Sequence, residues 1–176
     1  MHIMIRYLTY ATPLLALTLA FAAAAPSTAD KTVQQLRVEL SGDQAEIQKL
    51  RGEMKVTILD DLLFPEGSAE ITSAGKVALL KLLPTLKALQ DTKVVVAGYT
   101  DNLPIIAAYR DRYPTNWELG AARSASVVRF LQANGVNPDL LCASSFGSRH
   151  AVASNDTLAG QSRNRRTELL LIGPGT

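Results

Sequence analysis

The sequence predicts an α/β sandwich in which helices pack on one sheet. Short apolar runs rich in β-branched residues, such as 94–97 (Val-Val-Val-Ala), indicate buried strands. Longer segments with helical periodicity separate these runs, the clearest being residues 116–133. The elements alternate as strand, helix, strand, helix, strand and strand, which is the order expected of a layered α/β domain.

Length and charge restrict the possible functions. A chain of 176 residues fits one domain with appendages. The formal net charge is +2, and without residues 1–29 the balance is 17 basic against 16 acidic residues, a net charge of +1. A nearly neutral chain gives no electrostatic support for nucleic-acid binding.

Residues 1–29 have the features of a secretory signal. Arg6 supplies the basic start, residues 14–21 form an apolar core, and 22–24 are small alanines. This pattern predicts export to the periplasm. The alternative is an uncleaved inner-membrane anchor, because residues 7–25 carry no charge and are long enough to span a bilayer.

Residues 30–53 are predicted to form a helical or coiled-coil connector, because apolar residues recur with heptad spacing. Asp43 interrupts the series, and Gly42 weakens a helix by about 1 kcal/mol. The pattern therefore predicts either a weak homodimer through residues 33–54 or a single amphipathic helix that acts as a spacer. The heptad positions are Val33, Leu36, Leu40, Ile47, Leu50 and Met54.

The first half of the domain contains two strands and one helix. Apolar and polar residues alternate along 54–59, which indicates a strand, and a turn follows at 64–68. A helix should begin near Thr72 or Ser73 and end near Leu89, with a kink or restart at Pro84. Residues 93–98 form the next strand, and 105–112 form a loop near the mouth of the site.

The second helix, predicted at residues 116–133, has the clearest sequence signals for its start and its end. Thr115 and Glu118 form a capping box after Pro114, and Asn134-Gly135 favours a left-handed end after Ala133. Its inward stripe is expected to comprise Trp117, Ala121, Ser124, Val128 and Leu131. Strands at 140–146 and 166–172 follow, separated by a polar, loop-rich segment at 147–164 with a turn at 155–157.

Polar residues gather where the strand at 93–98 ends and the helix at 116 begins. The strand end places Asp101 where open α/β sheets put ligand contacts. The alternative is that this side chain closes a turn and contacts no ligand. Asn116 and Arg123 are two helical turns apart and lie on nearly one face. An acid, an amide and a guanidinium around one space suit a zwitterionic ligand. Of Arg165 and Arg166, one should face this space and the other solvent.

Three motifs carry a family resemblance: Gly98-x-Thr100-Asp101, Asn116-x-x-Leu119-x-x-x-Arg123 and Asn164-Arg165-Arg166. Residues 54–172 resemble the OmpA-like domain, the peptidoglycan-binding module that also ends flagellar stator proteins of the MotB type. The chain departs from the family pattern at Tyr99, Gly120 and Thr167, where histidine, serine and an aliphatic residue are usual.

The resemblance implies a four-stranded mixed sheet of βαβαβ-β type, followed by a tail at 173–176. It also implies non-catalytic binding of peptidoglycan through diaminopimelate, with an envelope or motor complex as a further partner. The residues implied to contact the ligand are Thr100, Asp101, Asn116, Leu119, Arg123 and Arg165.

Enzyme chemistry finds little support in the sequence. Beyond residue 29 the chain has one histidine, His150, and one cysteine, Cys142, so a clustered His/Cys metal site cannot form. No Gly-x-Ser-x-Gly elbow and no phosphate-binding glycine loop is present. We expect no cofactor, and we expect Cys142 to be buried as an apolar residue.

Neither of two candidate acid pairs fits the requirements of a glycosidase. As adjacent strand residues, Asp60 and Asp61 would point to opposite faces, and Glu66 and Glu70 lie in a turn without an apolar shield. The competing function is an inner-membrane stator or structural part. A stator would require an acidic residue in its membrane span, and none lies between Met1 and Ala29.

Overall fold

A mixed five-stranded sheet forms one layer of the domain, in the order β1-β2-β5-β3-β4. The structure, a computed structural model, describes residues 45–50 and 53–173. Its strands are β1 (Ala45–Leu50), β2 (Glu53–Leu59), β3 (Lys93–Tyr99), β4 (Leu141–Gly147) and β5 (Arg166–Ile172). β3 and β4 are parallel and the other neighbours antiparallel. The predicted α/β class and mixed sheet are confirmed, and β1 adds a fifth strand to the four that were predicted.

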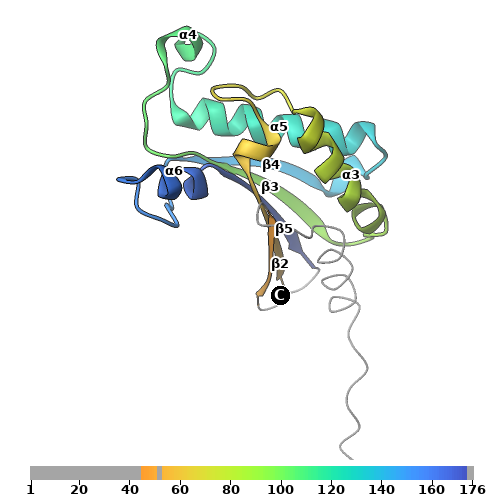
Figure 1. The fold of residues 1–176 in the computed structure, drawn as a ribbon. Helices are drawn as coiled ribbons and strands as arrows, with labels where there is room; N and C mark the ends of the chain where they lie inside the picture. The colour runs from red at the N-terminus through yellow and green to blue at the C-terminus, as the bar shows by residue number, and fades with distance from the viewer. Residues whose placement is uncertain (1–44, 51–52, 174–176) are drawn as a thin grey trace, which may run out of the picture.

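Helices form the second layer. α3 (Ser73–Lys87) and α5 (Asn116–Ala133) cover one face of the sheet (Figure 1). Three short helices, α2 (Asp60–Leu63), α4 (Ala107–Arg110) and α6 (Leu158–Asn164), and a 3-10 turn at Pro138–Leu140 complete the domain. No helix within residues 45–50 and 53–173 is long and apolar enough to cross a membrane.

The main core lies between the sheet and these two helices. Alternation along β2 buries Met54, Val56 and Ile58 on the helical side. Val94 and Val96 of β3 and Leu169 and Leu171 of β5 join them, together with Leu79, Leu82, Leu86, Val127 and Leu131 from α3 and α5. Each fully buried aliphatic side chain stabilises the domain by about 1.5–3 kcal/mol.

The predicted starts of both long helices are confirmed. The Thr72 side chain accepts a hydrogen bond from the backbone N–H of Gly75, and the capping box of Thr115 and Glu118 is present. Gly135 follows α5 with a φ of 88°, as a left-handed helix end requires. The expected restart at Pro84 is wrong, because α3 continues from Ser73 to Lys87 with the proline in its last turn.

The helical connector is wrong for residues 45–50. They form β1, which pairs antiparallel with β2 at the edge of the sheet. Met54 is buried because it alternates with Val56 and Ile58 in β2, not because it continues a heptad. The rest of the connector from 30 to 44, the segment 1–29 and most of the tail lie outside the described residues, as does most of the proposed dimer segment.

Two further expectations are wrong. Trp117 is 49% exposed and Ala121 is exposed, because α5 instead turns Leu119, Gly120, Arg123, Ser124, Val127 and Leu131 inward. Cys142 is exposed, and it lies on β4, an edge strand of the sheet. The segment 147–164 is loop-rich before residue 158, as expected, and its last residues form α6, whose first turn is capped by the Thr157 side chain.

Candidate ligand-binding site

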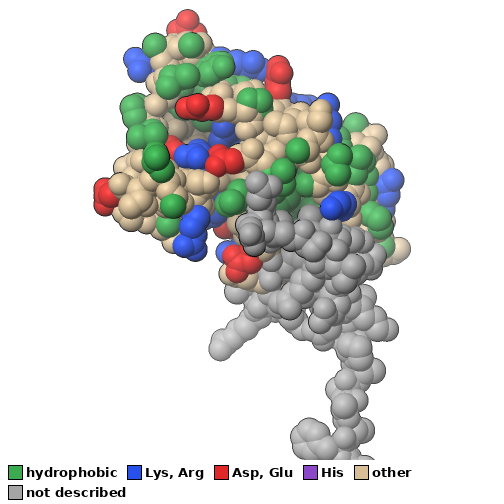
Figure 2. Space-filling view, in the orientation of Figure 1, with side chains coloured by type: hydrophobic (Ala, Val, Ile, Leu, Met, Phe, Trp, Pro, Cys, Tyr) green, Lys and Arg blue, Asp and Glu red, His purple; other side chains and the backbone are tan. Residues whose placement is uncertain are grey.

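A pocket of about 720 Å³ lies where the end of β3 meets the start of α5 and the segment between α6 and β5. The loops at 64–67 and 103–106 complete its wall. Charged side chains lie in this hollow and apolar side chains surround it (Figure 2). The volume is in the range of small-molecule sites.

The pocket floor includes Asp101, placed there by the end of β3. The backbone N–H of Thr100 donates to the Gly147 carbonyl, so Asp101 is held just beyond the sheet. Its Oδ1 accepts from the backbone N–H of Leu103 at 3.1 Å, and its Oδ2 accepts from Arg165 Nη1 at 2.9 Å. Asp101 therefore both closes a turn and presents a carboxylate to the pocket.

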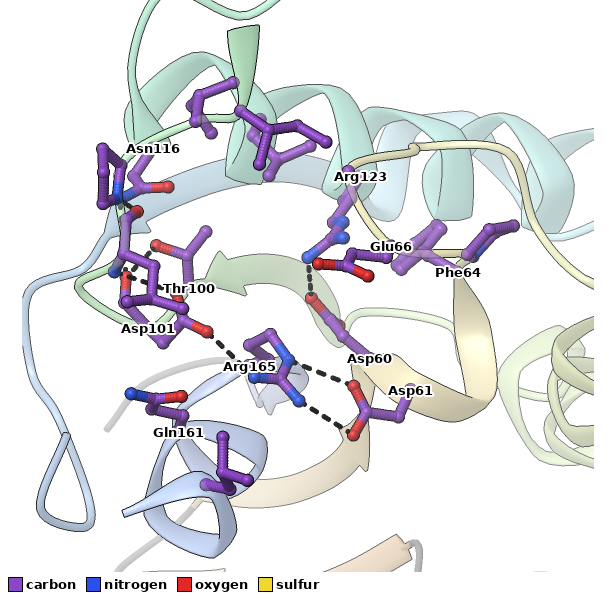
Figure 3. Close-up of a pocket in the computed structure, with 18 residues that line it drawn as sticks. Asp60, Asp61, Phe64, Glu66, Thr100, Asp101, Asn116, Arg123, Gln161 and Arg165 are labelled. Carbon is purple, nitrogen blue, oxygen red and sulfur yellow. Dashed lines mark hydrogen bonds and ion pairs between the residues drawn. The ribbon is translucent and has the colours of Figure 1, made fainter. Parts of the chain in front are cut away.

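Arg165 joins two acids across the pocket (Figure 3). Its Nε and Nη2 donate to the two carboxylate oxygens of Asp61, each at 3.1 Å, while Nη1 reaches Asp101. Ser162 also donates to Asp61. Burial pulls the pKa of Asp61 upward, but the hydrogen bonds from Arg165 and Ser162 outweigh it and hold the pKa below its usual range.

Arg123 lies in a buried ion pair. Its Nη1 donates to Asp60 Oδ2 at 2.8 Å and its Nε to the Ser68 carbonyl at 2.9 Å. Asp60 is 2% exposed, and its Oδ1 accepts from the Thr167 hydroxyl at 2.7 Å. Burial raises the pKa of Asp60, against the opposing effect of the Arg123 charge. Thr167 therefore has a structural role at a position where the family usually has an aliphatic residue.

Asn116 and Leu119 shape the remaining wall. Asn116 donates from Nδ2 to the Leu103 carbonyl at 2.9 Å, which fixes the loop after Asp101. Leu119 is buried in a small apolar cluster with Ala69, Ile105 and Tyr113. The structure thus brings all six predicted site residues to one pocket: Thr100, Asp101, Asn116, Leu119, Arg123 and Arg165.

Sequence reasoning missed the acids that face these arginines. Asp60, Asp61 and Glu66 also line the pocket. Asp60 and Asp61 are the first residues of α2, not adjacent residues of a strand, so both can contribute to one site. Their partners are more than 60 positions away along the chain, and no local pattern signals such a contact.

Arg166 does not face solvent, so that expectation is wrong. It is buried, pairs with Glu168 at 2.8 Å and lies 3.8 Å from the centre of the Tyr99 ring. Burial and the nearby Glu168 carboxylate raise the pKa of Tyr99 to about 12. Tyr99, where the family usually has histidine, thus provides an aromatic surface for this arginine.

Two glycines set the distance between α5 and β3. A β-carbon on Gly98 would collide with the Gly120 carbonyl, and one on Gly120 would collide with the Ser145 hydroxyl. Close contact at this point holds the first turns of α5, and with them Asn116 and Arg123, against the end of β3. Ser145 of β4 therefore occupies the space that a side chain at position 120 would need, and this chain has glycine there where the family usually has serine.

The described part of the chain also bears on whether the domain could bind a metal ion. Among those residues no group of three or more histidine, cysteine, aspartate or glutamate side chains could hold a metal ion. The fold and the site together define an α/β domain with a charged pocket at the end of its sheet.

The chain belongs to the OmpA family, whose model matches residues 63–165, more than half of the sequence. It is similar to Motility protein B of Bacillus subtilis (strain 168), with 28% identity over 151 residues, 85% of this chain and 55% of that protein. It is also similar to the peptidoglycan-binding protein ArfA of Mycobacterium tuberculosis (strain ATCC 25618 / H37Rv), with 32% identity over 110 residues, 62% of this chain and 32% of that protein.

A solved structure has the same fold. The cell wall anchor of the T6SS from Pseudomonas aeruginosa matches with a TM-score of 0.73 and 28% identity, covering 81% of this chain and 96% of that chain. The chain spans only about half or less of the length of the two curated relatives. The similarity therefore describes the domain they share.

Proposed function

We propose that the pocket binds peptidoglycan through the diaminopimelate of its stem peptide, without catalysis. The observation that carries this proposal is the meeting of Asp101 and Arg123 in one pocket of an OmpA-family chain. The ArfA relative is named as peptidoglycan-binding, and the solved neighbour is described as a cell wall anchor.

The ligand's ammonium group would bind at Asp101. This carboxylate is 7% exposed, and its Oδ2 faces the pocket beside Arg165. A charge-assisted hydrogen bond from an ammonium to a largely desolvated carboxylate is stronger than a neutral one. Asn116 and Thr100 lie at the same end of the pocket and complete the contacts there.

The ligand's carboxylate would bind at Arg123, with Arg165 on the opposite wall. Arg123 uses Nε and Nη1 for Ser68 and Asp60, and its Nη2 makes no hydrogen bond to a described residue. A planar guanidinium held on two sides offers its remaining donors in a fixed direction. Leu119 would contact the aliphatic part of the ligand.

Such binding would tether an envelope protein or complex to the cell wall, with the domain in the periplasm. A second candidate is an inner-membrane stator or structural part, which the similarity to Motility protein B favours. Amino-terminal sequencing of the protein from fractionated envelopes separates the two. A processed amino terminus supports an exported wall-binding protein, whereas Met1 retained in the membrane fraction supports the second candidate.

Isothermal titration with purified muropeptides tests the binding function itself. The proposal predicts saturable binding of peptides that contain diaminopimelate. It also predicts no release of cleaved product, which chromatography of the same mixture would detect. Absence of binding to muropeptides and to intact sacculi would contradict the proposal.

A further inference from the structure

Arg165 is shared unequally between two carboxylates of the pocket. Its Nε and Nη2 donate to the two oxygens of Asp61, each at 3.1 Å, which makes a two-pronged pair. Its Nη1 donates a single bond to Asp101 Oδ2, at 2.9 Å. Figure 3 shows the guanidinium between the two acids, with these bonds drawn. Two hydrogen bonds therefore hold Arg165 on Asp61, and one holds it on Asp101.

Asp61 is itself fixed in this position. Ser162 of α6, three positions before Arg165, donates from its hydroxyl to Asp61 Oδ2 at 2.7 Å. The Asp61 side chain is 46% exposed, whereas that of Asp101 is 9% exposed. An exposed ion pair contributes little to stability unless its geometry is two-pronged or it belongs to a network, and this pair meets both conditions. Asp61 can therefore control where the guanidinium lies without being part of the core.

Asp101 must keep free acceptor positions if it is to bind an ammonium group. An ionised carboxylate offers about four lone-pair positions. Oδ1 of Asp101 accepts from the Leu103 N–H and Oδ2 accepts from Arg165, so about half of these positions remain for a ligand. A second bond from Arg165 would occupy one more position. It would also bring the guanidinium closer to the incoming ammonium, and such contacts between like charges are costly.

We propose that Asp61 is a positioning residue whose two-pronged pair holds the Arg165 guanidinium aside and keeps Asp101 open to the ammonium of the ligand. In Asp61→Asn an amide nitrogen, which is a donor, replaces one acceptor, so the two-pronged pair cannot form. Asp101 is then the one charged partner left to Arg165 among the ion pairs of the described residues, and the guanidinium turns toward it. This inference rests on the proposed function, because it concerns the same ammonium site. Asp61 needs no contact with the ligand.

Titration of the full chain with a diaminopimelate-containing muropeptide tests the inference. Asp61→Asn should bind at least about fivefold more weakly than the unaltered protein, and a smaller loss in the folded variant would overturn the inference. Asp61→Glu keeps the charge and both acceptor oxygens, so it should retain more affinity than Asp61→Asn. Asp91→Asn removes an equal charge from an exposed position before β3, at the opposite end of that strand from the pocket, and should leave the affinity unchanged.

A double-variant cycle shows whether Asp61 acts through Arg165. In Arg165→Met no guanidinium is present to close on Asp101, so the addition of Asp61→Asn should change the affinity by less than about twofold. A loss as large as that in the unaltered background would mean that Asp61 acts on the ligand directly. That result would overturn the inference.

A crystal structure of Asp61→Asn gives a readout that does not depend on affinity. The inference predicts two hydrogen bonds from Arg165 to Asp101 in this variant. A guanidinium that stays in place, with its single Nη1 bond to Asp101, would overturn the inference. Absence of muropeptide binding by the unaltered protein would instead contradict the proposed function. Binding by the unaltered protein with an equal affinity in folded Asp61→Asn would overturn only the positioning role.

Discussion

Removal of Arg123 should destabilise the domain as well as weaken binding. Arg123→Met leaves the Asp60 carboxylate, which is 2% exposed, without its cation and leaves the Ser68 carbonyl without its donor. Breaking a buried pair on one side costs about 3–5 kcal/mol, because a desolvated charge remains uncompensated. That loss is a large part of the stability of a domain of this size.

A double variant isolates the cause of this loss. Asp60→Asn combined with Arg123→Met removes both charges, and replacement of a whole buried pair is often close to neutral. We therefore expect the double variant to recover more than half of the stability that Arg123→Met loses. Urea unfolding of the full chain, followed by circular dichroism, measures both changes.

A loss below about 1 kcal/mol in Arg123→Met would refute this reasoning, as would a double variant no more stable than the single one. The result also affects how binding data are interpreted. Loss of binding by Arg123→Ala alone mixes destabilisation with a missing contact. The double variant provides a more stable background that lacks the guanidinium.

Three further predictions follow from the same geometry. Gly98→Ala should cost about 1–3 kcal/mol in urea unfolding, because the new methyl meets the Gly120 carbonyl. In a titration, Arg123→Lys should bind the peptide as weakly as Arg123→Ala does, since the point charge of lysine cannot replace a planar guanidinium. Asp61→Asn should lower stability near neutral pH, and acid titration should show that difference shrinking below about pH 4. The reason is that a carboxyl whose pKa is lowered on folding stabilises the folded chain only while it is ionised.

Local signals in the sequence predicted the elements that hold the site. α5 begins at Asn116 and ends at Ala133, as its capping box and the Asn-Gly end indicate. The apolar run before Asp101 predicted β3 because β-branched residues fit a buried strand. These features depend on residues within a few positions of one another, so the sequence alone determines them.

Long-range features were not predictable in this way. The heptad spacing near residue 47 is local, but pairing with β2 overrides it and makes Ala45–Leu50 a strand. The pairing of Arg123 with Asp60, across 63 positions, depends on the complete fold. Arg166 is buried only because Tyr99 and Glu168 surround it, and no rule for single residues predicts such a cluster.

The central claim is that Asp101 receives the ammonium of the ligand. Asp101→Asn removes the charge while keeping an acceptor for the Leu103 N–H, and Arg112→Ala serves as an exposed control expected to change affinity by no more than about 1 kcal/mol. Titration with a diaminopimelate-containing muropeptide should show a loss of roughly 30- to several-thousand-fold for Asp101→Asn, and Asp101→Ala should lose at least as much. Affinity equal to that of the unaltered protein, in a folded Asp101→Asn chain, would contradict the claim.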